Sequence, residues 1–501
     1  MTNLCALFRE CWRDHEDDPA FVEPDGRVWS YGDVERLSAE FSAALFETGL
    51  KPGERVVAQI DKSVSAVGLY LGTLRAGGVY VPLNTAYTAH EVAFFLKDAS
   101  PRIFFCRPET YESLRPVAAS AGVPHVAAFP TASKVDHWRA ERLARADIIA
   151  ERSENDLASI LYTSGTTGRS KGAMLSHGAL AANAEALHKA WGFREGDVLL
   201  HALPIFHIHG LFVALHTAFL NASKIIFLDK FDPALVRRCL KEATILMGVP
   251  TFYSRLLDDG LTGEECANMR LFISGSAPLT EEASNAFAAR TGFRILERYG
   301  MTEAGMIASN PLEGERIAGT VGYALPGVSV RVADENGREV PRGEVGVVEV
   351  KGSSLFSGYW GLPEKTAEEM RADGFFVTGD VGTMAPDGRL SLVGRAKDLI
   401  ISGGYNIYPI EIEAVLDAAP GVKESAVVGA PHKDLGEGVI AVLVAEDEPV
   451  DEAVLQKALD DNLARFKHPR RFHWEKELPR NAMGKVQKAA LREKHKDAYK
   501  V

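Results

Sequence analysis

The chain has 501 residues, enough for more than one domain with a large buried core. Its net charge of −12, with 46% hydrophobic and 25% charged residues, argues against a general nucleic-acid binder, which carries a basic footprint. Five scattered cysteines, without a C-x-x-C pair, favour a reducing compartment over a disulfide framework or a zinc site. Residues 1–18 do not resemble a signal peptide, and no uncharged run reaches the ~18 residues of a membrane span, so we expect a cytoplasmic protein.

The first part of the chain alternates between helical and strand patterns. Helices are expected at 31–47, 63–75 and 91–96, and strands at 55–60, 78–82 and 102–106. A more polar stretch, 108–155, follows. The alternation then resumes, with helices at 179–191, 211–219 and 233–242 and strands at 198–202, 224–228, 245–249, 270–274 and 294–297. This order is typical of parallel sheets covered by helices, here in two αβ halves.

The pattern changes near residue 320. Short β-type runs at 329–333, 345–351 and 389–393 are separated by Gly, Pro and Asn turns, which indicates a small antiparallel barrel or sheet. A last unit follows, with helices at 410–418 and 452–463 and strands at 422–428 and 439–444. We therefore expect an α/β fold. It has a large N-terminal domain at 1–394, which includes the β-rich subdomain at about 320–394, then a hinge at 395–398 and a small mobile α+β domain at 399–501.

A dense polar loop follows the apolar run 157–161. Residues 162–172 read Y-T-S-G-T-T-G-R-S-K-G, with three glycines, five serine or threonine residues and Lys171. Backbone N–H groups and hydroxyls in such a turn can surround phosphate oxygens, and the lysine adds positive charge. The loop is not a Walker A motif, because Ser170 rather than glycine precedes Lys171. Taken alone, the segment is as compatible with an ordinary polar surface loop.

Other short motifs fall where strands are expected to end. Residues 274–278 read S-G-S-A-P and residues 298–303 read R-Y-G-M-T-E. Because open α/β sheets carry their sites at the carboxyl ends of strands, these loops and the phosphate loop are expected to converge. Three more motifs lie further on: T-G-D at 378–380, G-R-A-K-D at 394–398 and P-R-N-A-M-G-K at 479–485.

In this order, the motifs resemble those of the acyl-adenylate-forming enzymes over nearly the whole chain. The resemblance implies ATP, Mg²⁺ and coenzyme A as ligands, with Glu303 holding the metal together with Thr166. The ATP-binding residues that it implies are Thr163, Ser164, Gly165, Thr166, Thr167, Gly168, Lys171, Ser276, Ala277, Pro278, Tyr299, Gly300, Met301, Thr302, Asp380 and Arg395. Lys485 is implied to hold the substrate carboxylate, Lys397 to be the hinge, and Gly403 and Gly404 to border the pantetheine tunnel. Thr302, Glu303, His207 and Lys485 are the implied catalytic residues.

Two details point to the acid. His207 opens H-I-H-G within 204–210, where relatives gate the thiol tunnel, and Arg298 precedes Tyr299. A buried guanidinium is costly without an anion, so a second substrate carboxylate is its natural partner, held with His207 and Ser274. The alternative is an internal salt bridge from Arg298 to an acid such as Glu297. The surrounding text resembles the malonyl-CoA synthetases, which implies malonate as substrate, with methylmalonate a poorer one; Ala304 departs from many relatives.

Two other functions fit the same motifs. An adenylation enzyme would load a separate carrier protein, and testing CoA against a carrier would separate the two. A nucleotide-sensing scaffold is disfavoured, because Glu303, Asp380, Arg395 and Lys485 are all present. As a protein partner we consider a lysine acetyltransferase acting on Lys485, and we expect neither nucleic acid nor membrane insertion.

Overall fold

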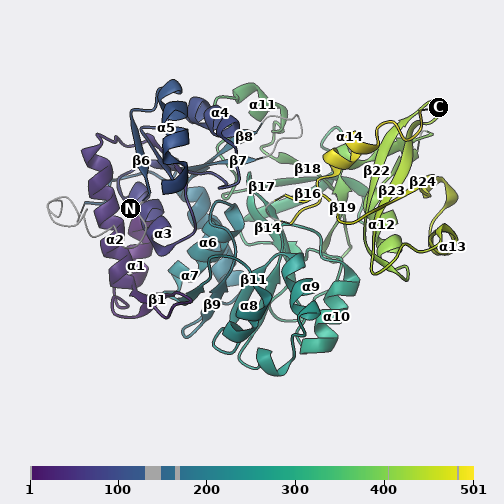
Figure 1. The fold of residues 1–501 in the computed structure, drawn as a ribbon, viewed down its shortest axis with the longest axis horizontal. Helices are drawn as coiled ribbons and strands as arrows, with labels where there is room; N and C mark the ends of the chain where they lie inside the picture. The colour runs from purple at the N-terminus through teal and green to yellow at the C-terminus, as the bar shows by residue number, and fades with distance from the viewer. Residues whose placement is uncertain (1–2, 130–147, 164–169, 404, 482–483, 501) are drawn as a thin grey trace.

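The computed structural model describes residues 3–129, 148–163, 170–403, 405–481 and 484–500, and within them the strands form four sheets (Figure 1). Ser164, Gly165, Thr166, Thr167, Gly168 and Gly404, all predicted site residues, lie outside the described residues. Two large sheets lie side by side in the N-terminal domain, a four-stranded sheet follows, and a separate sheet forms the C-terminal domain. This is the mixed α/β architecture that the sequence predicted.

The first sheet has six strands in the order β6-β5-β3-β4-β7-β8. All pairs are parallel except β7–β8. The strands are β3 (Arg55–Gln59), β4 (Val79–Pro82), β5 (Ile103–Cys106), β6 (His125–Ala128), β7 (Leu157–Thr163) and β8 (Lys171–Ser176). Neighbouring residues of β3 enter different cores, Val56 with α2 (Tyr31–Glu47) and α3 (Val64–Arg75), and Val57 with α4 (Ala89–Ala99) and α5 (Tyr111–Ser120). Helices therefore cover both faces, which explains the continuous apolar runs of these strands.

The second sheet has nine strands in the order β15-β14-β13-β12-β11-β9-β10-β1-β2 and is parallel from β1 to β13. Its strands are β1 (Pro19–Val22), β2 (Val28–Ser30), β9 (Val198–His201), β10 (Lys224–Phe227), β11 (Ile245–Gly248), β12 (Leu271–Ser274), β13 (Leu296–Met301), β14 (Gly305–Ser309) and β15 (Tyr323–Ala324). One face packs on α1 (Leu4–Trp12), α6 (His177–Ala190) and α7 (His216–Leu220). The other packs on α8 (Pro233–Leu240), α9 (Pro250–Asp258) and α10 (Glu281–Thr291).

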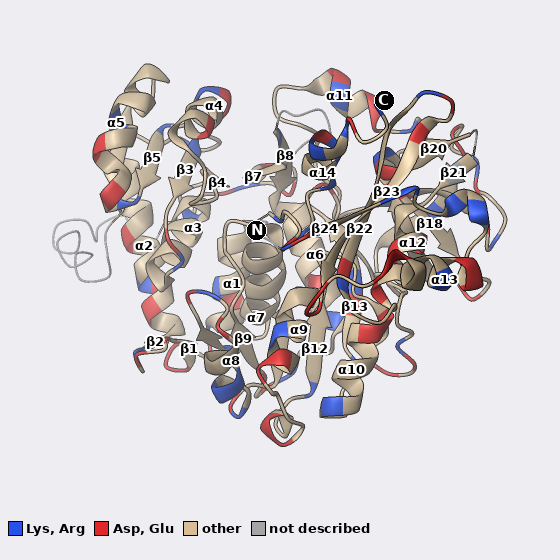
Figure 2. Ribbon diagram, turned by 45° about the vertical axis from the view of Figure 1, so that its right-hand side comes forward, with Lys and Arg blue, Asp and Glu red and all other residues tan. Residues whose placement is uncertain are grey.

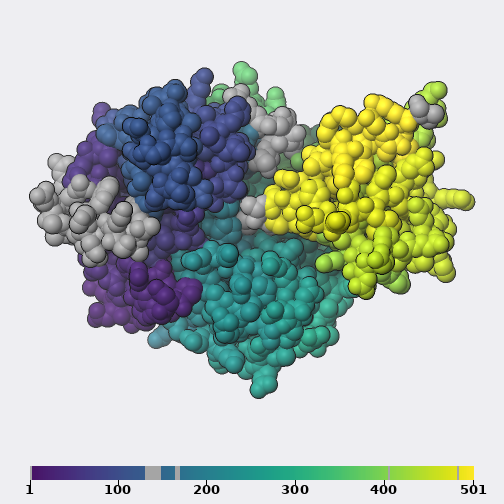
Figure 3. Space-filling model, viewed as in Figure 1, coloured from purple at the N-terminus to yellow at the C-terminus, as the bar shows by residue number. Residues whose placement is uncertain are grey.

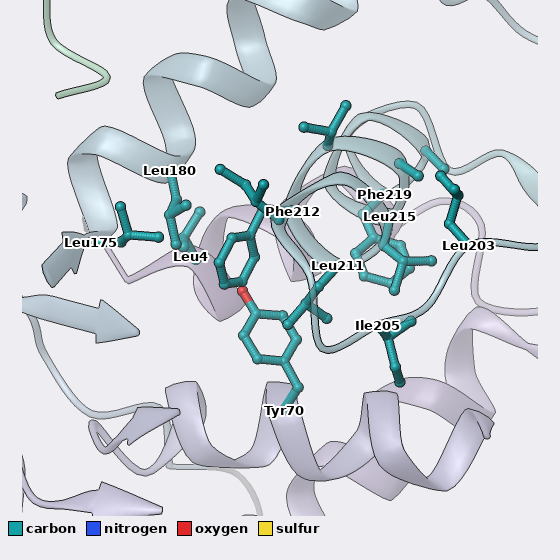
Figure 4. Close-up of a cluster of buried hydrophobic side chains, with 14 of the residues drawn as sticks. Leu4, Tyr70, Leu175, Leu180, Leu203, Ile205, Leu211, Phe212, Leu215 and Phe219 are labelled. Carbon is teal, nitrogen blue, oxygen red and sulfur yellow. The ribbon is translucent and has the colours of Figure 1, made fainter. Parts of the chain in front are cut away.

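One apolar core joins the two large sheets. It includes Tyr70 from α3 and Phe212 and Phe219 from the segment before and within α7, and Figure 4 shows these side chains converging with Leu4 and Leu180. The helix expected at 211–219 begins as a π-helix, His209–Leu215, and becomes α7. π-Helical turns are frequent at functional sites, and this one begins within the H-I-H-G motif.

The β-rich subdomain is an antiparallel sheet, β16-β17-β18-β19, of β16 (Val328–Ala333), β17 (Val345–Gly352), β18 (Phe376–Met384) and β19 (Leu390–Arg395), and α11 (Pro363–Glu368) lies in the connection between β17 and β18. The C-terminal sheet contains β20 (Ile400–Ser402), β21 (Tyr405–Ile407), β22 (Val422–His432), β23 (Gly436–Ala445) and β24 (Arg471–Glu475). Its helices are α12 (Pro409–Asp417), α13 (Glu452–Asn462) and α14 (Lys488–His495). Figure 3 shows this domain, green to yellow, against one side of the large domain.

Two of the differences between the structure and the sequence expectation bear on the site or on the large sheets. The polar stretch 108–155 contains a helix, α5, and a strand, β6, because a few buried residues such as Leu114 and Ala118 are enough to dock a short helix. Strand β13 runs through Met301, so Arg298 and Tyr299 lie within the strand and not beyond its end.

Acidic and basic residues are interspersed over the outer helices (Figure 2). Among the described residues, no helix has the length and apolar character needed to cross a membrane.

Candidate active site

The predicted phosphate loop joins two antiparallel strands. Thr163 ends β7 and pairs with Lys171, which begins β8. The Lys171 ammonium lies 3.1 Å from Glu369 Oε1 and 3.9 Å from the centre of the Tyr359 ring. The Tyr359 hydroxyl lies within hydrogen-bond distance of two carboxylates, 2.7 Å from Glu369 Oε2 and 3.1 Å from Glu303 Oε1. The lysine expected to meet phosphate is therefore held in a network of two carboxylates and a phenol.

The predicted metal ligand, Glu303, is buried, and burial raises the pKa of its carboxyl group. Nearby Lys171 and the hydrogen bond from Tyr359 act in the opposite direction. Among the described residues, no group of three or more His, Cys, Asp or Glu side chains is placed to hold a metal. A single carboxylate suits Mg²⁺, which keeps several waters and takes its other ligands from substrate phosphates. The residues present thus fit a metal that arrives with ATP.

A second group of predicted residues meets where β13 faces the β-rich subdomain. The Tyr299 hydroxyl donates to Asp380 Oδ2 at 2.5 Å, and Arg395 Nε lies 2.6 Å from Asp380 Oδ1. Burial and the Asp380 charge raise the pKa of Tyr299 well above its ordinary value. Asp380 is fixed further, because its own N–H donates to Thr378 Oγ1 at 3.0 Å. The three residues predicted to contact the adenosine are therefore brought together. Gly300 and Met301 continue the strand, and Thr302 lies in the turn after it.

Arg298 lies in the same strand and is 3% exposed. Its Nε and Nη2 atoms are buried and have no hydrogen-bond partner within the described ranges. Burial lowers the pKa of the guanidinium to about 9, and nearby Tyr253 partly offsets the lowering. Glu297 is not its partner: strand alternation sends that carboxylate to the other face, where it accepts a hydrogen bond from the Leu279 N–H at 3.3 Å. Burial raises the pKa of Glu297 to about 8.

Arg298, His207 and Ser274 were predicted to hold the second carboxylate, and the structure does not place all three side chains together. Ser274 pairs in register with Glu297, so its side chain shares the face opposite to Arg298. A role for Ser274 beside the guanidinium is therefore not supported by this alternation. His207 is within electrostatic range of Arg298: burial, the charge of Arg298 and the charge of Lys485 lower the pKa of its imidazole to about 4. It is neutral at pH 7.

His209 lies in the H-I-H-G motif, and no role was predicted for it from the sequence. Its Nδ1 lies 3.2 Å from Ser276 Oγ, and its buried Nε2 has no partner in the described part of the chain. Burial lowers the pKa of His209 well below its ordinary value, with Arg298 adding to the effect. Ser276 has a φ of 72°, which is unusual for a non-glycine residue and turns the loop that carries Ala277 and Pro278. The spacing H-I-H in the sequence was the available signal for this residue.

The C-terminal domain reaches this group through the turn that carries Lys485. Gly484 lies close to Thr251 of α9, because a Cβ added at position 484 would be 3.2 Å from Thr251 Oγ1. Lys485 is solvent-accessible, yet its surroundings lower the pKa of its ammonium to about 8, through desolvation first and the charge of Arg395 second. Asp380 and Asp398 act in the opposite direction. Lys485 is therefore within electrostatic range of Arg395 and His207 in the large domain.

Two further predicted residues, Lys397 and Gly403, lie where the chain enters the C-terminal domain and directly after its first strand. Lys397 is in a short 3₁₀ turn, Ala396–Asp398, between the last strand of the β-rich subdomain and the first strand of the C-terminal sheet. Asp398 is tied to the C-terminal helix α14 by an ion pair with Arg492 at 2.8 Å. Gly403, with a φ of 59°, donates its N–H to the Leu435 carbonyl at 2.9 Å, within its own domain. The CoA contact predicted for it stays a prediction.

Comparison with known proteins extends the picture. The model of the AMP-binding enzyme family matches residues 8–360, and that of the AMP-binding enzyme C-terminal domain matches residues 411–485. A malonate–CoA ligase of Arabidopsis thaliana is 33% identical over 98% of this chain and 89% of its own length. A sulfoacetate–CoA ligase of Cupriavidus necator is 32% identical over 97% of both chains.

Solved structures agree over the full length. The crystal structure of ATP-bound MatB from Rhodopseudomonas palustris is 49% identical, covers 99% of this chain and 100% of its own, and superposes with a TM-score of 0.95. The apo form of the same protein, also 49% identical and with 100% of both chains covered, has a TM-score of 0.84. The whole-chain agreement is thus higher with the ATP-bound form.

Proposed function

This chain belongs to the AMP-binding enzyme family, and we propose that it ligates malonate to coenzyme A through a malonyl-AMP intermediate, releasing pyrophosphate and AMP. The name of the Arabidopsis relative, a malonate–CoA ligase, supports the substrate, and the ATP-bound MatB structure supports the use of ATP. The relative named as a sulfoacetate–CoA ligase also takes a small acid with a second anionic group. Each of these acids needs a cation at the far end of the acid site.

Arg298 is the observation that carries the proposal. Its guanidinium is 3% exposed and leaves two N–H-bearing atoms, Nε and Nη2, without partners among the described residues. Burying a charge without a counter-ion costs several kcal/mol, so a site of this kind is expected to receive an anion. A carboxylate can accept two parallel hydrogen bonds from a guanidinium. His207 and His209, neutral beside it, add polar atoms without adding charge.

The first step joins the near carboxylate of malonate to the α-phosphorus of ATP, and pyrophosphate leaves. Lys171 would neutralise phosphate charge once it exchanges Glu369 for the nucleotide, and Lys485 would hold the attacking carboxylate from the other side. Asp380, with Tyr299 and Arg395, would fix the ribose. Mg²⁺, held by Glu303 and, by resemblance, Thr166, supplies charge neutralisation of the phosphates when bound. The chain thus acts by positioning and by placing charge where it develops.

The second step joins the CoA sulfur to the carbonyl carbon of malonyl-AMP, and AMP leaves. Lys485 is within electrostatic range of the large domain, as the first step requires, and the higher agreement with the ATP-bound relative supports that arrangement. We propose that the C-terminal domain turns about Lys397 before the second step, which withdraws Lys485 and brings Gly403 and Gly404 to the thiol. Domain movements of this kind commonly separate the half-reactions of one site.

The cellular compartment of the enzyme and the acetylation of Lys485 are also proposals. Five cysteines are free thiols, which favours a cytoplasmic enzyme, since reduced thiols are usual in that compartment. Lys485 is solvent-accessible with a pKa of about 8, so part of it is a neutral amine near pH 7. A lysine acetyltransferase would find that amine reactive, and acetylation would remove the charge that the first step needs.

The direct test is acid-dependent release of pyrophosphate by the purified protein with ATP and Mg²⁺. The panel contains malonate, methylmalonate, sulfoacetate, succinate, acetate and butyrate, each with CoA, with a carrier protein and with neither. Malonate should give the highest kcat/KM, methylmalonate a lower one, and CoA should be the preferred acceptor. Highest kcat/KM with a monocarboxylic acid would contradict the substrate, and a preference for the carrier protein would contradict the acceptor.

A further inference from the structure

Gly275 leaves a space that the guanidinium of Arg298 occupies. A Cβ built on Gly275 would lie 2.4 Å from Cζ, 2.5 Å from Nε and 2.6 Å from Nη1 of Arg298. Real Cβ atoms essentially never approach other atoms this closely, so a side chain at 275 and the present position of Arg298 exclude each other. The three nearest atoms all belong to the end of one flexible side chain.

The backbone of Gly275 does not itself require glycine. Its φ is outside the left-handed region, unlike the φ of Ser276, which is 72°. The residue directly follows β12, and its N–H donates to the Gly248 carbonyl of the neighbouring strand at 3.3 Å. An alanine would therefore meet the conformational needs of this position. The nearest obstacle is the guanidinium.

Sheet register explains why these two residues meet. Ser274 of β12 pairs with Glu297 of β13, so Gly275 follows beside Arg298. Side chains alternate between the faces of a strand, and Gly275 and Arg298 therefore share the face opposite to Ser274 and Glu297. Because position 275 lacks a side chain, Arg298 can lie across the end of β12, near His207 and His209.

We propose that Gly275 is a specificity-determining residue. Because Gly275 has no side chain, the guanidinium of Arg298 can occupy the position from which it binds dicarboxylic acids. The inference rests on the proposed role of Arg298 toward the distal carboxylate. A methyl group at 275 would force the guanidinium out of its present position while the rest of the fold accommodates it. Selectivity should then move from malonate toward acids with a neutral tail.

The test compares Gly275→Ala, Arg298→Ala and the double variant, using malonate and butyrate. We expect Gly275→Ala to lower kcat/KM for malonate at least about tenfold, mainly through KM, and to change that for butyrate less than about threefold, because only the charged tail loses a desolvated partner. In the Arg298→Ala background the same substitution should add less than about threefold, since coupled residues are non-additive. Gly263→Ala is the matched control: there the nearest atom to a new Cβ is the Thr291 carbonyl oxygen at 3.2 Å, away from this group.

Each outcome decides one of the two claims. If Gly275→Ala leaves malonate unchanged, or lowers malonate and butyrate by the same factor, the role of Gly275 is wrong whatever Arg298 does. If Arg298→Ala itself lowers both acids equally, the proposed role of Arg298 fails, and that result does not depend on Gly275. If thermal unfolding shows that Gly275→Ala does not fold while the double variant does, the contact is a folding constraint and the specificity claim is overturned.

Discussion

The buried guanidinium of Arg298 is expected to determine how the enzyme discriminates between acids. Arg298→Ala would leave the distal carboxylate of malonate desolvated and unpaired. The expected loss in kcat/KM for malonate is roughly 2–5 kcal/mol, the range for breaking a desolvated charge pair. Butyrate should lose little or gain, because an unpaired positive charge has left its surroundings. Steady-state assays with both acids measure the split, and equal declines would make Arg298 structural.

Glu369 is expected to compete with the phosphates of ATP for the Lys171 ammonium. Its Oε1 lies 3.1 Å from the Lys171 ammonium and also 3.2 Å from Lys365. Glu369→Gln removes the charge but keeps the shape, so KM for ATP should fall by up to about fivefold, since a partly exposed ion pair is worth at most ~1 kcal/mol. Lys365→Met is the control, because it removes the pair that does not involve Lys171. A rise in KM for ATP would mean that Glu369 orients Lys171 and does not compete.

At the scale of elements, local pattern predicted most strands and helices of the two large sheets, including the helix at 31–47 to the residue. The reason is that strands buried on both faces need continuous apolar runs, which are easy to see. The β7–β8 hairpin was not predicted, because β8 begins at Lys171, inside the polar sequence that was interpreted as a loop. The Lys171–Glu369 contact joins residues 198 positions apart, and only tertiary folding brings them together.

The same limit applied to the site. Asp380, Tyr299 and Arg395 were found from short motifs, and the structure brings them together. Ser274 was grouped with Arg298, but strand alternation places their side chains on different faces. Tyr359 had no local signal, because its contacts with Glu303 and Lys171 depend on how the β-rich subdomain docks.

The 3₁₀ turn Ala396–Asp398 is the element on which domain movement is proposed to depend. Lys397→Pro fixes φ at that residue and restricts rotation of the backbone. Malonyl-AMP formation should persist within about threefold, while thioester formation from supplied malonyl-AMP should fall at least about tenfold, because only that step needs the new orientation. Rapid-quench measurement of each half-reaction gives the two rates, with Lys397→Ala as the flexible control. Thioester formation at the normal rate would place the hinge elsewhere.

For the whole molecule, the two domains share one site through Lys485. Lys485→Ala should lower malonyl-AMP formation by at least ~3 kcal/mol, about a hundredfold or more, since one pre-organised charge contact is removed. Conversion of supplied malonyl-AMP and CoA to product should change little. Lys488→Ala is the matched control, because Lys488 pairs with Glu413 at 2.5 Å inside the C-terminal domain. Equal loss in both half-reactions would show that Lys485 holds the domains together and is not specific to the first step.

The central claim is that a carboxylate oxygen of malonate attacks the α-phosphorus of ATP. Malonate labelled with ¹⁸O in both carboxyl groups tests it directly when turnover with ATP and CoA is followed by mass spectrometry of the nucleotide product. Each AMP formed should carry one ¹⁸O atom, because the bridging oxygen stays with phosphorus when the CoA thiol attacks the carbonyl carbon. Unlabelled AMP, or label in inorganic phosphate accompanied by ADP, would contradict it.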